Sequence, residues 1–195
     1  MPTRLPIALG VVQDRDMLSE PIRVADVDPG ALHILQLMYL MLPAYLANMA
    51  PPFTRFWPGW NRPISRRWLG DHKTVVGFCA GLAAALLATF VQSKVSWGGG
   101  LVPYTEWPLI GLALGFGAMA GDSLKSLLKR LKGIPPGRPW IPMDQLDFVA
   151  GSLLLISPFA RLTLLDMAII LLVTLVGDIA VNHLSYALGI RNTKW

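Results

Sequence analysis

Long apolar stretches constrain this chain more than any other feature of its sequence. Three of them, at 31–48, 75–92 and 164–184, approach the roughly 20 residues that a helix needs to cross the hydrocarbon core of a bilayer. Charged residues make up only 15% of the chain, whereas soluble domains carry about 25%. We therefore predict an all-α integral membrane protein.

Two further segments, at 108–132 and 144–158, complete a predicted bundle of five transmembrane helices. Asp28 is a suitable N-cap residue and Pro29 suits the first helical position, so the first helix should begin there. We expect one membrane domain over 29–195, preceded by a polar leader outside the membrane.

Basic residues are unevenly distributed over the connections between these helices. Segments 49–74 and 122–143 hold five Lys or Arg each, ten of the 17 in the chain, whereas the alternate connections hold only Lys94 and Arg161. The positive-inside rule places the two basic connections and the C-terminus in the cytoplasm and the acidic leader, 1–28, outside. Membrane lipids then account for the net charge of +5, and no nucleic acid is expected as a partner.

The third predicted helix changes character along its length. Its apolar part, 108–120, gives about 20 Å of helix, which is shorter than the ~30 Å hydrocarbon core. Beyond it, Asp122, Lys125, Ser126 and Lys129 share one face, and leucines occupy the opposite face. A carboxylate at membrane depth needs a partner or a cavity, so this face predicts a functional site.

Two more carboxylates stand at the start of the fourth helix. Asp144 and Asp147 are three residues apart and share a helix face. They suit an N-cap and a first-turn acid, or, together with Asp122, an oxygen cluster for Mg²⁺, which also binds substrate phosphates. Neighbouring Lys and Arg side chains would then meet the phosphates themselves.

A Gly-Asp turn at Gly70 and Asp71 leads into Lys73 and Thr74, immediately before the second helix. The Lys73 ammonium, the Thr74 hydroxyl and the free N–H groups of a helix N-terminus predict a phosphate site. The glycine spacing of a P-loop is absent.

Other polar and small residues lie inside the apolar segments. Asn48 ends the first helix, and Asp178 and Asn182 are one turn apart on the last. Such residues line functional cavities or hydrogen-bond neighbouring helices, and the sequence leaves both open. Small residues four apart predict close helix packing; these pairs are Gly77/Gly81, Gly111/Gly115 and Gly117/Gly121.

Taken together, these motifs resemble those of the CDP-archaeol synthase family, small five-helix relatives of the CTP-dependent phosphatidate cytidylyltransferases. The resemblance rests on segments 43–51, 70–77, 121–130 and 144–148 and covers residues 35 to the C-terminus. The His-Gly-Gly element of the larger bacterial enzymes is missing, and Asp-Gln replaces their Asp-Arg. The compact family shares both features.

The resemblance implies a membrane cytidylyltransferase that transfers CMP from CTP to a lipid phosphate, giving a CDP-lipid and pyrophosphate. It implies Mg²⁺ held by Asp122, Asp144 and Asp147. The residues expected to hold the triphosphate and the lipid phosphate are Lys73, Thr74, Lys125, Ser126, Lys129 and Arg130, with Asn48 and Asn182 contacting the nucleotide or lining the pocket. The sequence does not report whether the lipid is ether- or ester-linked.

The alternative is a non-catalytic membrane scaffold that binds anionic lipids through its basic loops. It predicts dispensable acids and interchangeable Lys and Arg. A CDP-alcohol phosphotransferase would need an Asp-rich motif on adjacent helices that the sequence lacks, and we find no inverted repeat of the transporter type.

Overall fold

The computed structural model describes residues 28–56, 61–95, 97, 100–135 and 138–189. Apart from one isolated β-bridge, the regular elements among these residues are all helices, which confirms the predicted all-α class. The helices are α1 (Pro29–Met49), η3 (Pro51–Phe56), α2 (Val75–Val95), η4 (Tyr104–Glu106), α3 (Trp107–Leu131), α4 (Met143–Ile156) and α5 (Leu164–Ala187), where η marks a 3₁₀-helix. The predicted leader, except for Asp28, lies outside the described residues.

Helix starts follow the local sequence where capping residues are present. Asp28 is the N-cap of α1, as predicted, and its Oδ2 accepts a hydrogen bond from the Ala31 N–H at 3.0 Å. At α5, Thr163 and Asp166 form a capping box in which each side chain accepts a hydrogen bond from the other's backbone N–H. Both arrangements satisfy N–H groups that a helix leaves without intrahelical partners.

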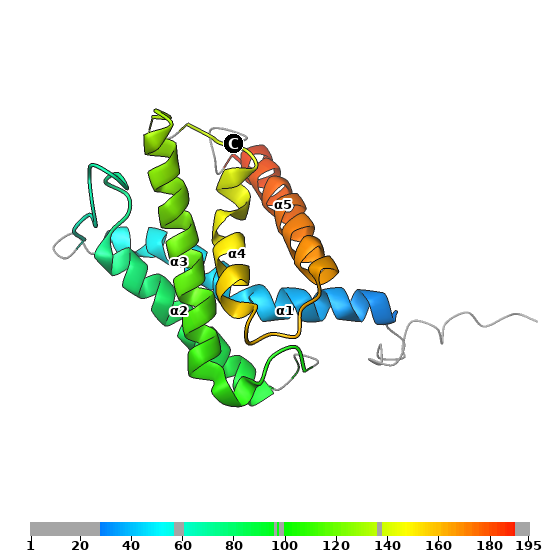
Figure 1. The fold of residues 1–195 in the computed structure, drawn as a ribbon. Helices are drawn as coiled ribbons and strands as arrows, with labels where there is room; N and C mark the ends of the chain where they lie inside the picture. Colours follow the sequence, from blue (N-terminus) through cyan, green and yellow to red (C-terminus); the bar gives the residue numbers. More distant parts are fainter. Residues whose placement is uncertain (1–27, 57–60, 96, 98–99, 136–137, 190–195) are drawn as a thin grey trace, which may run out of the picture.

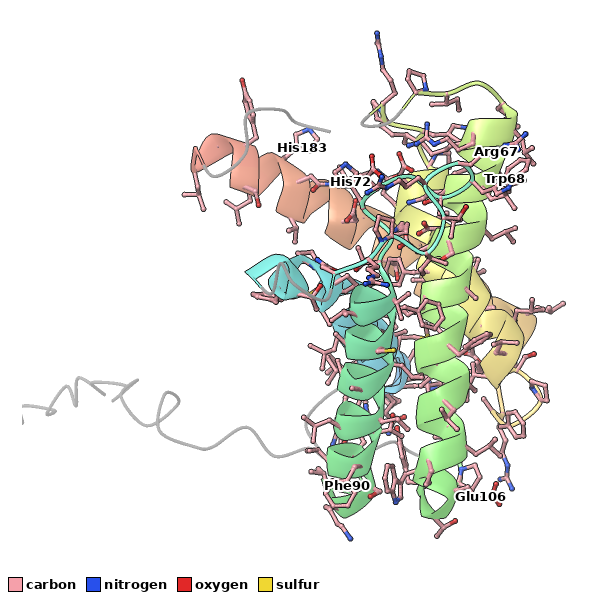
Figure 2. The ribbon with its side chains drawn as sticks, turned by 90° about the vertical axis from the view of Figure 1, so that its left-hand side faces the viewer. Arg67, Trp68, His72, Phe90, Glu106 and His183 are labelled. Atoms are coloured by element: carbon pink, nitrogen blue, oxygen red, sulfur yellow. The ribbon has the colours of Figure 1, made fainter. Side chains whose placement is uncertain are left out.

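α2, α3, α4 and α5 run in alternating directions between the two ends of the molecule (Figure 1). α3 lies between α2 and α4, while α1 crosses behind them and contacts all four other helices (Figure 1). Arg67 and His72 lie at one end, which we call the charged end, and Phe90 and Glu106 lie at the other (Figure 2). At that other end a hydrogen bond from the Arg161 N–H to the Leu101 carbonyl, 2.8 Å long, joins two connections.

Glycines bring α3 and α4 into backbone contact. A Cβ on Gly151 would clash with the carbonyl oxygen of Gly117, and one on Gly121 would clash with the carbonyl oxygen of Asp147. The glycine pair predicted at 117 and 121 is therefore a packing surface, as expected. This contact places the charged turns of α3 directly beside the first turns of α4.

Three helical segments are long and apolar enough to cross a bilayer among the residues described, at Pro29–Thr54, Val75–Val95 and Leu164–Ala187. α4 has only 14 residues, about 21 Å of helix, and α3 ends in charged turns. These two helices therefore complete the bundle by packing against the others. The core joins buried side chains of all five α-helices, among them Leu37, Leu40, Ala85, Ile110, Leu114, Val149, Ile156 and Ile170.

Candidate active site

Six charged side chains form one cluster at the charged end. Lys73 precedes α2, three members lie on α3, and two lie in the first turns of α4. The cluster consists of Lys73, Lys125, Lys129, Asp122, Asp144 and Asp147. Its three positive and three negative charges balance, which allows all six to be largely withdrawn from water at the edge of a membrane.

Lys125 is the centre of this cluster. Its ammonium nitrogen lies 3.2 Å from Asp122 Oδ1, 3.3 Å from Asp144 Oδ1 and 2.7 Å from Asp147 Oδ2. Three carboxylates repel one another unless a cation lies between them. The structure therefore contains a position where three carboxylates converge on one cation.

The segment before α2 is held by a short antiparallel pairing. The Ile64 N–H donates to the Lys73 carbonyl at 2.8 Å, and the Val75 N–H donates to the Arg62 carbonyl at 3.1 Å. The intervening loop turns at Gly70, whose φ of +83° is readily adopted by glycine. This pairing fixes the Lys73 side chain over α3.

The Lys73 ammonium pairs with Asp122. Burial, and to a smaller extent the positive charge of Lys125, lower the pKa of Lys73 to about 8, although the negative charges of Asp147 and Asp144 act in the opposite direction. At neutral pH Lys73 is still mostly protonated. Its protonated form is less stable than that of a surface lysine, and an anion that binds beside it would stabilise that form.

Lys129 is buried and holds the loop between α3 and α4. Its ammonium donates to the Arg138 carbonyl at 2.5 Å and to both oxygens of Asp144 at 3.1 and 3.0 Å. Asp144 also accepts a hydrogen bond from the Trp140 N–H at 2.6 Å. Asp144 is therefore not the N-cap of α4, a position taken by Pro142; it ties the preceding loop to α3.

Two other predicted residues of α3 make local contacts. The Ser126 hydroxyl is buried and donates to the Asp122 carbonyl at 3.0 Å. The Arg130 guanidinium donates to the Ile134 carbonyl just beyond the helix. These contacts stabilise the helix and its C-terminal turn, and the phosphate contacts expected of both residues stay a prediction.

A polar cavity of about 420 Å³ opens beside the cluster, between the end of α1 and the start of α2. Four of the predicted residues line it: Asn48, Lys73, Thr74 and Asp122. The Thr74 hydroxyl also accepts a hydrogen bond from the Gly77 N–H at 3.1 Å, so it caps α2. Volumes of about 300–1,000 Å³ are typical of small-molecule sites, and a nucleotide suits this range.

The structure adds cavity residues that sequence reasoning missed as site residues. Thr54, Asn61, Asp71 and His72 also line the cavity. His72 has no second histidine or cysteine at metal-ligand spacing in the sequence, and no motif marks Asn61. Their position depends on the pairing of 62–64 with 73–75, which no local pattern reveals.

Asn182 is not among the residues that line the polar cavity. Its side-chain amide donates to Asp178 Oδ2 at 2.8 Å, one turn away on α5. In the described part of the chain, α5 packs against α1 and α4 and not against α3. The contact of Asn182 with the nucleotide therefore stays a prediction.

The cluster has the donor chemistry of a site for a hard cation. No three Asp, Glu, His or Cys side chains form a ready-made metal site among the described residues. However, Asp122, Asp144 and Asp147 converge on the Lys125 ammonium, and carboxylate oxygens are the donors that Mg²⁺ prefers. The residues present fit Mg²⁺ by donor type, provided that the Lys125 ammonium moves aside.

Comparison with known proteins gives one consistent family. A family model described as CarS-like, CDP-archaeol synthase, matches residues 31–195. CDP-archaeol synthase of Methanospirillum hungatei JF-1 is 38% identical over 175 residues, which cover 80% of this chain and 100% of the relative. CDP-archaeol synthase of Aeropyrum pernix is 35% identical over 176 residues, covering 84% of this chain and 93% of the relative.

A solved structure agrees with these sequence relationships. It is that of an intramembrane enzyme for archaeal membrane lipid biosynthesis, with a TM-score of 0.64 and 34% sequence identity. The similarity covers 76% of this chain and 94% of that protein.

Proposed function

The chain belongs to the CDP-archaeol synthase family, and from this premise we propose how its own residues carry out the family's reaction. It is a CTP-dependent membrane cytidylyltransferase that makes a CDP-lipid. The alternative of a non-catalytic scaffold is not supported by these relationships. The observation that carries the assignment of residues is the cluster of three lysines and three aspartates beside a polar cavity.

CTP occupies the polar cavity in this proposal. The cavity opens at the charged end, and Lys73 and Asp122 line it where it meets the cluster. Lys73 meets the triphosphate, because its ammonium is partly desolvated and a phosphate is a stronger anionic partner than a shared carboxylate. Asn48 and Asn61 supply amide groups on the cavity wall that suit the polar groups of a nucleotide.

Asp122, Asp144 and Asp147 would hold Mg²⁺. When bound there, the ion supplies positive charge that offsets the negative charge of the triphosphate. Lys125 remains next to these carboxylates and turns its ammonium toward a phosphate oxygen. The other contacts of Asp144, with Lys129 and the Trp140 N–H, keep that carboxylate oriented.

The chemical step is the attack of a lipid phosphate oxygen on the α-phosphorus of CTP. A bond forms between that oxygen and the α-phosphorus, the bond from the α-phosphorus to the oxygen that bridges to the β-phosphate breaks, and pyrophosphate leaves with the electron pair. The attacking oxygen is already anionic, so no general base is needed. Catalysis then depends on positioning and on neutralising charge, which Lys73 and Lys125 provide.

The lipid substrate in this proposal is an archaeal-type ether lipid phosphate. The test is to incubate the purified protein with Mg²⁺, CTP and either an isoprenoid ether glycerol phosphate or an ester-linked phosphatidate. We expect CDP-lipid and pyrophosphate in equal amounts by mass spectrometry, with the ether lipid preferred. Absence of both products with every lipid phosphate would contradict the proposed activity, and preference for phosphatidate would contradict only the lipid assignment.

The protein is a multi-pass membrane protein, and we propose that its charged end faces the cytoplasm, where CTP is available. The basic connections lie at this end, as the positive-inside rule requires. In a Cys79→Ala background, a membrane-impermeant maleimide on intact cells should label Glu106→Cys and leave Arg67→Cys unlabelled until the cells are opened. These two positions lie at opposite ends (Figure 2). The reverse labelling pattern would overturn this orientation.

A further inference from the structure

A second cavity, of about 280 Å³, lies between α3 and α4 on the outer surface of the helix pair. Its walls include Leu124, Leu128 and Leu154, which are all exposed, and the small residues Ala150 and Gly151 line it between these leucines. An apolar hollow on a membrane protein's surface is unsuited to a nucleotide and well suited to hydrocarbon. We call it the α3–α4 groove.

The groove has only two charged lining residues, Lys125 and Asp147, whose ammonium nitrogen and Oδ2 are 2.7 Å apart. The same ammonium lies 3.2 Å from Asp122 Oδ1, and Asp122 lines the polar cavity. Lys125 therefore stands between an apolar groove on the α4 side of α3 and a polar cavity on the α2 side.

We propose that the α3–α4 groove holds the hydrocarbon chain of the lipid phosphate, with the phosphate against Lys125. This inference rests on the function proposed above and adds the place of its second substrate. The head group finds the Lys125 ammonium where the groove meets the cluster, and Asp147, the acidic residue beside it, is one of the three carboxylates assigned above to Mg²⁺. From Asp147 to Leu154 the groove follows α4 for about 10 Å, away from the charged end and into the membrane.

This placement brings the two substrates to Lys125 from different sides. CTP enters through the polar cavity and the lipid phosphate through the groove. The lipid phosphate and the departing pyrophosphate therefore need not use the same route. Phosphoryl transfer requires the attacking and leaving oxygens to be roughly in line. Lys125 lines the groove and pairs with Asp122, which lines the polar cavity, so the two substrates can approach the cluster from opposite sides of α3.

The test fills the groove with a large side chain. Ala150→Trp should raise the KM for the lipid phosphate about tenfold or more, since even two displaced methylenes change affinity by about that factor. The KM for CTP and the binding of CTP by calorimetry should stay at the wild-type values. The matched control is Ala83→Trp, because Ala83 is also exposed, on α2 at a similar distance from the charged end, and lines neither cavity.

A second measurement does not depend on turnover. A benzophenone amino acid at position 150 should crosslink to a labelled lipid phosphate in a saturable way, and excess unlabelled lipid phosphate should compete while the dephosphorylated lipid should not. The same probe at position 83 should give only unsaturable labelling by bulk lipid. If Ala150→Trp fails to bind CTP, Ala150→Leu is judged by the same KM criterion.

The possible outcomes distinguish a failure of the proposed groove from a failure of the proposed activity. An unchanged lipid KM in a folded position-150 variant, or identical crosslinking at positions 150 and 83, would overturn the groove even if the wild type makes CDP-lipid. Absence of product in the wild type would instead contradict the proposed function, and saturable crosslinking at position 150 would still support the groove.

Discussion

Replacing Asp122, Asp144 or Asp147 singly by asparagine should lower kcat by about 100-fold or more, which corresponds to about 2.7 kcal/mol. All three carboxylates lie within 3.3 Å of the Lys125 ammonium. An amide keeps the shape of the side chain but removes the charge that Mg²⁺ requires from its ligands. The measurement is kcat at saturating CTP and lipid phosphate, with the folded fraction determined by thermal unfolding in detergent. EDTA should abolish wild-type turnover, and added Mg²⁺ should restore it.

Asp166→Asn is the matched control for these variants. Asp166 is also a buried helix-start carboxylate, but it lies away from the cluster, where it pairs with His33 at 2.7 Å and bonds to Thr163. This exchange should lower the free energy of unfolding by about 1 kcal/mol and leave kcat near the wild-type value. If the three cluster variants also kept near wild-type kcat, the acids would serve only to anchor lysines and the proposed Mg²⁺ site would be wrong.

The fold was predictable because the bilayer leaves a chain few choices. Backbone groups in hydrocarbon must be hydrogen-bonded within the protein, so a long apolar stretch becomes a helix. Local signals such as Asp28 before Pro29 also predicted where a helix begins. Composition alone could not predict how the short helix α4 is accommodated, because that depends on a backbone contact between Gly117 and Gly151.

The sequence predicted which residues of the site share a helix face. It did not predict which residues on other segments they contact. The 3.6-residue period placed Asp122, Lys125, Ser126 and Lys129 on one face, and the structure turns that face inward while Leu124 is exposed. This polarity is the reverse of that of a soluble surface helix, because lipid and not water surrounds a membrane-spanning bundle. The period does not say which side chain meets which residue on α4 or before α2.

Lys125 and Ser126 lie on that same face but make different kinds of contact. Lys125 reaches three carboxylates from two helices, whereas Ser126 bonds to its own helix. Lys73 reaches Asp122, 49 positions further along the chain, because an antiparallel pairing of residues with no strand signature holds it there. Contacts over such separations are set by tertiary packing, and a local pattern carries no information about them.

Replacing Lys73 or Lys125 by glutamine should lower kcat/KM for the reaction about tenfold or more. A charge-assisted hydrogen bond to a phosphate contributes about 1.5–3 kcal/mol, and each factor of ten corresponds to about 1.4 kcal/mol. Lys73→Gln should act mainly on CTP, since Lys73 lines the polar cavity. Lys125→Gln should act on both substrates, since Lys125 lies between the cavity and the groove. Initial rates over a grid of CTP and lipid phosphate concentrations separate these effects.

A substitution at Lys129 can distinguish a structural role of this residue from a phosphate-binding role. It was predicted from the sequence to contact phosphate, and in the structure its ammonium already contacts the Arg138 carbonyl and both oxygens of Asp144. If that role is structural, Lys129→Gln should lower the unfolding temperature more than Lys73→Gln does, and any lost activity should follow the loss of folded protein. A full unfolding temperature with a tenfold loss of kcat/KM would restore Lys129 to the phosphate-binding set.

Arg62, Arg66 and Lys132 are the matched controls, because they carry the same charge at the same end of the molecule. Arg62 is exposed, Arg66 makes an exposed ion pair with Asp71 at 3.3 Å, and Lys132 lies over the Trp140 ring at 4.5 Å. Exposed pairs contribute about 0–1 kcal/mol, and attraction to anionic lipid adds about 1 kcal/mol per residue, which matters little to a protein held by transmembrane helices. Each glutamine variant should therefore keep kcat/KM within about twofold of the wild type. Equal, small effects at Lys73, Lys125 and the three controls would mean that the positive charge acts only in bulk, and the phosphate contacts assigned to these two lysines would be wrong.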